Sequence, residues 1–301
     1  MRNGPTPLRI NEGHAVVKAT YTVNCSILLT DLPLLDRPAA AKDAGFSAVE
    51  FWWPFATPTP SDAEVTAFIR AIQDAGVRLT GLNFAAGDMP AGDRGIVSNP
   101  ALQKAFQDNV AIAVDIADTL GTRAFNALYG NRDDAFAPAT QDDVAADNLA
   151  FAAAAADRIG AIVLVEPVSG APRYPIKTAA DAIGVIDRVH AESGTTNLRL
   201  LADLYHLDVN GDDTSAVIRD HGSRIGHVQI ADAPGRGEPG TGGVALARQL
   251  HELADGGYAG YLGLEYKATR PDTFDWIPRD ERGANAVNIE TLSQQQETRI
   301  S

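Results

Sequence analysis

Short apolar runs alternate with longer amphipathic segments along this chain. Runs that are rich in branched and aromatic residues are typical of buried strands. We expect strands at 22–28, 47–52, 78–83, 123–128, 161–166, 198–203, 225–230 and 260–265. The segments between them carry apolar residues at helical spacing, as at Val65, Phe68 and Ile72. The pattern therefore predicts eight strands that alternate with helices.

Glycines mark the junctions from each helix to the next strand. Glycine enters the left-handed backbone region without steric cost, so it commonly follows a helix. The junction glycines are Gly45, Gly76, Gly121, Gly160, Gly194, Gly222 and Gly257. Helix starts are also marked, as by Ser61 and Glu64, which have capping-box spacing.

The regular repeat favours one α/β domain, a single (β/α)8 TIM barrel. The competing fold is an open doubly wound sheet, but no G-x-G-x-x-G loop follows the first strand. We expect the barrel at 21–278, a polar N-terminal leader at 1–20, and a C-terminal helix and tail at 279–301.

Four oxygen-bearing side chains fall near the ends of consecutive predicted strands. The fifth strand, "AIVLVE", ends at Glu166 and the sixth ends at Asp203. The seventh carries Gln229 and the eighth ends at Glu265. In a barrel these side chains would converge, because catalytic groups project from the carboxyl ends of the strands. Any one of these acids alone could equally be a salt-bridged structural group.

Three converging carboxylates repel one another and raise one another's pKa unless a cation neutralises them. A divalent metal ion is the simplest such cation. Because all four donors are oxygens, Mg²⁺ or Mn²⁺ is favoured over Zn²⁺. We therefore expect one divalent metal ion as the cofactor.

Other polar and aromatic residues lie near the same strand ends. His206 follows Asp203 by three residues, and we expect it to contact substrate or relay a proton. Arg236 lies in the loop "GRGEPGTGG", which could approach a ligand or be flexible and solvated. Lys267 could neutralise an anionic substrate or be solvated. One of two adjacent tryptophans should cover the pocket, and Trp53 is our candidate.

Composition excludes several kinds of protein. The net charge of −14 over 301 residues argues against nucleic-acid binding through phosphate contacts. A single cysteine, Cys25, excludes an intrachain disulfide and a multi-cysteine zinc site. No apolar run reaches the roughly 18 residues that span a bilayer. We expect a cytoplasmic protein without membrane contact, and the sequence leaves a homo-oligomer open.

Several stretches resemble the hydroxypyruvate isomerase family, within the xylose-isomerase-like TIM barrels. The matching stretches include "AGDMPAGDRG", "VEP", "ADLYH", "GHVQIADAPGRGEPGTG" and "LEYKA", and the similarity covers roughly 21–278. The resemblance implies that Glu166, Asp203, Gln229 and Glu265 hold the metal. It also implies that Glu166 and Glu265 are the acid/base pair. Gln229 supports the isomerase branch, since many sugar epimerases carry histidine there.

The resemblance implies conversion of hydroxypyruvate to tartronate semialdehyde through an enediolate. The substrate carboxylate needs a cation, for which Arg236 and Lys267 are candidates. The alternatives are isomerisation or epimerisation of a larger substrate (a ketohexose, oxo-tetronate or inosose) and a non-catalytic carbohydrate-binding barrel. An endonuclease IV-like activity is disfavoured, because its zinc site is histidine-rich and this acidic chain has six histidines.

Overall fold

Eight parallel strands close into a barrel in the computed structural model, which describes residues 16–292. Each strand pairs with its neighbours in sequence, and the first strand of the barrel pairs with the last. The strands are β2 (Thr20–Asn24), β3 (Ala48–Phe51), β4 (Arg78–Asn83), β5 (Ala124–Asn126), β6 (Ile162–Val165), β7 (Leu198–Asp203), β8 (Ile225–Ile230) and β9 (Tyr261–Leu264). The predicted (β/α)8 fold is therefore confirmed.

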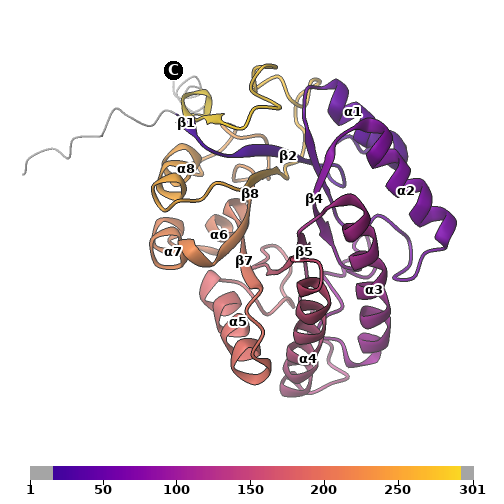
Figure 1. The fold of residues 1–301 in the computed structure, drawn as a ribbon. Coiled ribbons are helices and arrows are strands. Elements are labelled where there is room, and N and C mark those ends of the chain that lie inside the picture. The colour runs from indigo at the N-terminus through magenta and orange to yellow at the C-terminus, as the bar shows by residue number, and fades with distance from the viewer. Residues whose placement is uncertain (1–15, 293–301) are drawn as a thin grey trace, which may run out of the picture.

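Helices form a ring outside the strands (Figure 1). They are α1 (Arg37–Asp43), α2 (Asp62–Ala75), α3 (Gln103–Leu120), α4 (Pro138–Asp157), α5 (Ala179–Ser193), α6 (Leu204–Asn210), α7 (Thr214–His221) and α8 (Leu246–Asp255). Short 3-10 turns lie at Leu34–Asp36, Pro100–Leu102 and Gly222–Arg224. Both α6 and α7 follow β7, so the loop after this strand is itself partly helical.

Local sequence signals account for most helix ends. Ser61 and Glu64 form the expected capping box at the start of α2. Gly76 and Gly194 end α2 and α5 in the left-handed region, with φ of 64° and 75°. Gly222 differs, because its φ is −51° and the chain continues directly into a 3-10 turn. Helix α7 therefore does not need a left-handed residue to end.

The first barrel strand is displaced from its predicted position. β2 covers Thr20–Asn24 instead of 22–28. The Asn24 carbonyl accepts a hydrogen bond from the Leu28 amide (3.0 Å), and its side-chain oxygen accepts one from the Ser26 amide (3.0 Å). Asparagine favours such local turns. Cys25 therefore lies after the strand, where it is fully buried.

The segments that flank the barrel meet each other (Figure 1). β1 (Val16–Val17) pairs antiparallel with β10 (Val287–Asn288), and Val17 and Val287 are buried. Most of the predicted leader, residues 1–15, and the end of the predicted tail, residues 293–301, lie outside the described residues. Among the described helices, none is long and apolar enough to cross a membrane.

Candidate active site

A cavity of about 460 Å³ lies at the carboxyl ends of the barrel strands. Glu166, His206, Arg236, Glu265 and Lys267 all line it. The tryptophan that lines it is Trp52, whereas Trp53 packs against Phe55 and donates to the Thr57 carbonyl (2.8 Å). The prediction that Trp53 covers the pocket is therefore wrong, and Trp52 takes that place. β3 ends at Phe51, so strand alternation no longer fixes the direction of the two tryptophans.

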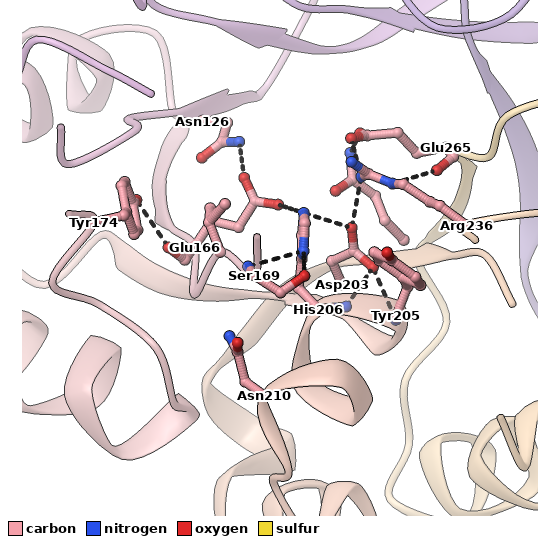
Figure 2. A network of polar contacts seen from close by, with 12 residues as sticks. Asn126, Glu166, Ser169, Tyr174, Asp203, Tyr205, His206, Asn210, Arg236 and Glu265 are labelled. Atoms are coloured by element: carbon pink, nitrogen blue, oxygen red, sulfur yellow. Dashed lines mark hydrogen bonds and ion pairs between the residues drawn. The ribbon is translucent and has the colours of Figure 1, made fainter. Parts of the chain in front are cut away.

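Glu166 follows β6 directly and points toward the cavity (Figure 2). Its carboxylate accepts a hydrogen bond from the Asn126 amide (2.7 Å). The Tyr174 hydroxyl donates to the backbone carbonyl of Glu166 (3.0 Å), which fixes the chain at this point. Burial, with a further contribution from the Asp203 carboxylate, raises the pKa of Glu166 to about 8. Glu166 can therefore hold a proton near neutral pH.

Arg236 bridges two other carboxylates (Figure 2). Its Nη2 lies 2.9 Å from Asp203 Oδ2 and 2.5 Å from Glu265 Oε1. Its Nε donates to the Glu265 carbonyl (3.0 Å), and its guanidinium lies 5.4 Å from the centre of the Tyr205 ring. Burial raises the pKa of Glu265 well above its ordinary value, and the Arg236 charge opposes that shift. This one guanidinium is shared by two buried acids.

The loop that carries Arg236 is held in place by buried carboxylates. Glu238 is fully buried and accepts hydrogen bonds from the Thr269 amide (2.7 Å) and hydroxyl (2.6 Å). Asp232, also fully buried, accepts one from the Gly240 amide (2.9 Å). The Lys267 amide donates to the Arg236 carbonyl (2.6 Å). The alternative of a flexible, solvated loop is therefore wrong, and Arg236 is presented from a fixed backbone.

His206 presents one defined nitrogen to the acidic cluster. Its Nδ1 accepts a hydrogen bond from the Ser169 amide (3.0 Å) and lies 2.7 Å from the Ser169 hydroxyl. Burial lowers the pKa of His206 to about 4, so the ring is neutral at pH 7. Since Nδ1 is an acceptor, the ring hydrogen is on Nε2, which lies 3.5 Å from Asp203 Oδ2 and 3.9 Å from Glu166 Oε1.

Side chains of this site could hold a metal ion. Glu166, Asp203 and His206 offer ligand atoms within 4.8 Å of one another. Gln229 lies on β8, between β7 and β9, and donates from Nε2 to Glu265 Oε2. Its buried Oε1 has no hydrogen-bond partner among residues 16–292. A buried, unpartnered amide oxygen beside carboxylates is an appropriate ligand for a hard cation. The donors present therefore fit a divalent metal.

Sequence reasoning missed four residues of this region. Glu50 and Asn24 are buried and bond to Gln229 and Glu265, whereas Arg94 and Ser169 line the cavity. An acid inside the apolar run "AVEFWW" and an arginine inside "AGDRG" were the available signals for Glu50 and Arg94. The role of Ser169 depends on a residue 37 positions away, so no local pattern could indicate it.

The model of the protein family "Xylose isomerase-like TIM barrel" matches residues 38–287 of this chain. The chain therefore belongs to the xylose isomerase-like TIM barrel family. A Streptomyces coelicolor protein named "Putative hydroxypyruvate isomerase" is 51% identical over 88% of this chain and 97% of its own length. The Escherichia coli protein named "Hydroxypyruvate isomerase" is 30% identical over 82% of this chain and 93% of its own. These relatives show that the chain is an isomerase.

Other similar proteins widen the range of substrates in the family. A Cupriavidus necator protein named "2-oxo-tetronate isomerase" is 32% identical over 82% of this chain and 92% of its own length. A Brucella melitensis crystal structure titled "AP endonuclease, family 2" is 28% identical, with a TM-score of 0.76 over 86% of this chain and 97% of its own. A Methylomonas D-allulose 3-epimerase, 19% identical with a TM-score of 0.69 over 93% and 98% of the two chains, shares the fold.

Proposed function

We propose that this isomerase uses a divalent metal ion to interconvert hydroxypyruvate and tartronate semialdehyde. One observation carries the proposal: Glu166 and Glu265 line the same cavity, and burial raises the pKa of both. Perturbed carboxyl groups in a cleft are typical of acid/base catalysis. Relatives named as hydroxypyruvate isomerases, matched over most of their length, support the substrate.

The metal would be held by Glu166, Asp203, Gln229 and Glu265, all of which offer oxygen. Mg²⁺ and Mn²⁺ suit such a donor set. When bound, this ion supplies charge stabilisation for the enediolate that forms from the substrate. His206 carries hydrogen on the nitrogen that faces the acids, so we assign it as a hydrogen-bond donor to a substrate oxygen.

The reaction moves one proton between neighbouring carbons. A glutamate in its carboxylate form removes a proton from the hydroxymethyl carbon, and a protonated glutamate returns one to the former carbonyl carbon. The hydroxyl proton passes from one substrate oxygen to the other, and we assign His206, which lines the cavity, to hydrogen bonding with that oxygen pair. We assign the two proton transfers to Glu166 and Glu265. Burial raises the pKa of both carboxyl groups in the metal-free protein, and perturbed carboxyl groups of this kind support the assignment.

The substrate carboxylate requires a cation that is not already neutralised. Arg236 is shared between Asp203 and Glu265, so it is less suited to this role than to orienting substrate oxygens. Lys267 and Arg94 also line the cavity. Within residues 16–292, the Arg94 Nη1 donates to two backbone carbonyls, of Met89 (3.1 Å) and Asp93 (2.6 Å), and to no carboxylate, which leaves its charge available. We assign Arg94 and Lys267 to carboxylate binding.

A four-carbon substrate of the oxo-tetronate class is the second candidate. The cavity of about 460 Å³ is larger than a three-carbon acid requires. A relative named 2-oxo-tetronate isomerase, with 32% identity, supports this alternative. A larger neutral sugar is less favoured, because it would not use the Arg94 and Lys267 charges.

Solvent deuterium uptake tests the proposal. Chelator-treated protein, reloaded with Mg²⁺ or Mn²⁺, is incubated in D₂O with hydroxypyruvate, a 2-oxo-tetronate or a neutral ketohexose, and the carbons are followed by NMR. We expect metal-dependent exchange with the acids, abolished in Glu166→Gln and Glu265→Gln and retained in Glu192→Gln, a partly exposed control. Near-normal exchange in either of the first two variants contradicts the assignment. An Arg94→Met variant should raise KM for the acids while sparing any neutral ketose turnover.

A further inference from the structure

A fourth carboxylate lies buried beneath the cavity. Glu50, on β3, is 3% exposed and does not line the cavity that holds the acid/base pair. It accepts hydrogen bonds from three side chains: His227 Nε2 (2.7 Å), Gln229 Nε2 (2.7 Å) and Asn24 Nδ2 (3.1 Å). The barrel order runs β3, β2, β9, β8, so Glu50 reaches across the barrel interior to the two β8 residues.

A glycine on the intervening strand makes this reach feasible. A Cβ atom at Gly263, on β9, would lie 2.7 Å from Gln229 Cγ and 2.8 Å from Glu50 Oε1. Both distances are shorter than side chains normally allow. The absence of a side chain at Gly263 therefore provides the space in which Glu50 and Gln229 meet.

Glu50 determines which end of the Gln229 amide faces it. Gln229 Nε2 donates to Glu50 Oε1 and to Glu265 Oε2, while Gln229 Oε1 has no hydrogen-bond partner in the described part of the chain. Reversing the amide would place its oxygen against two carboxylate oxygens and lose both hydrogen bonds. Glu265 also contacts Arg236 and lines the cavity, whereas the side chains that donate to Glu50, those of His227, Gln229 and Asn24, belong to barrel strands. Glu50 is thus the carboxylate dedicated to this orientation.

We propose that Glu50 is a positioning residue that fixes the Gln229 amide so that its oxygen is available to the metal. The inference rests on the proposed function in one respect, that Gln229 is a metal ligand. His227 and Asn24 donate hydrogen bonds to Glu50 and keep it in place against Gln229. Partners of this kind typically change metal affinity when they are altered.

The test measures Mn²⁺ binding by calorimetry on the full chain. Glu50→Gln keeps the side-chain length, and Glu50→Asp keeps the charge but retracts it from Gln229. We expect each to weaken Mn²⁺ binding by about tenfold to a hundredfold, the range for altered partners of metal ligands. In a Gln229→Ala background, neither substitution should weaken binding further, because Glu50 acts through Gln229.

Two outcomes with the variants overturn the inference. Wild-type affinity in Glu50→Asp would mean that Glu50 contributes charge alone, and losses that add to that of Gln229→Ala would mean that it acts by another route. Wild-type protein provides a measurement that needs no variant: the Gln229 side-chain amide protons should exchange slowly in the metal-free state, and fast exchange contradicts the proposed bonds. If the wild-type protein itself fails to bind Mn²⁺, the proposed function fails instead, so the two failures are distinguishable.

Discussion

Ionisation of Glu166 should destabilise the metal-free protein, so Glu166→Gln should stabilise it at alkaline pH. Burial and the Asp203 carboxylate raise the pKa of Glu166 from an ordinary 4.5 to about 8. Between these values the unfolded chain has lost this proton while the folded chain retains it. Stability therefore falls as pH rises, because the folded state binds more protons. At about 1.4 kcal/mol per pH unit, the loss reaches roughly 3–5 kcal/mol by pH 8.

Glutamine has nearly the same size and shape as glutamate but carries no charge. Its amide oxygen can accept the hydrogen bond from Asn126 that the carboxylate accepts. The assay is urea unfolding of chelator-treated wild type and variant at pH 6, 7 and 8. We expect the stability difference in favour of Glu166→Gln to grow with pH and to level off above about pH 8.

A matched control replaces a solvent-exposed glutamate in the same way. Glu192 is about half exposed and pairs with Arg188 on the surface, so Glu192→Gln should change stability by less than about 1 kcal/mol at every pH. Parallel pH profiles for wild type and Glu166→Gln would refute the reasoning. So would a variant that is less stable than wild type at pH 8, because it would show that the carboxylate is stabilised where it is buried.

Three further perturbations test other parts of the site. Arg236→Met leaves Asp203 and Glu265 without their shared cation, so metal-free stability should fall by about 3–5 kcal/mol, with saturating Mn²⁺ restoring much of it in calorimetric melts. Gly263→Ala should lower stability by about 1–3 kcal/mol in urea unfolding, because the new methyl group overlaps Glu50 and its partner; wild-type stability would contradict that contact. Glu238→Gln should cost about 1–3 kcal/mol and raise KM, since the loop loses hydrogen-bond acceptors; an unchanged KM would show that the loop is fixed by other contacts.

The site contains more buried carboxylates than Arg236 alone can neutralise. Four buried carboxylates, of Glu50, Glu166, Asp203 and Glu265, lie in one connected cluster with this single guanidinium. Like charges at this spacing require protonation or a counter-cation. In the metal-free protein, the Arg236 guanidinium and protonation of carboxyl groups reduce this excess of negative charge. The same excess would favour binding of a divalent cation.

Local sequence pattern was enough to predict the strand positions and the placement of the strand-end acids. Glu166 and Glu265 each follow a buried strand by one residue, and Asp203 ends its strand. Such residues share one edge because the barrel repeats with the βα unit. At the end of β2 the side chain of Asn24 accepts a hydrogen bond from the Ser26 amide and starts a turn. The apolar pattern continues past this turn, so it predicted the wrong strand boundary.

The sequence by itself therefore determined the βα repeat, the barrel, and the oxygen donors at its strand ends, because each is encoded within one strand–helix unit. Only the tertiary structure decided which ring nitrogen of His206 carries the hydrogen and which acids Arg236 bridges. It also decided that Glu50 bonds to Gln229, 179 positions away in the sequence. These contacts cross the barrel, so they exist only after it closes, and their directions depend on burial and on the space left at Gly263. No periodicity within one segment carries that information.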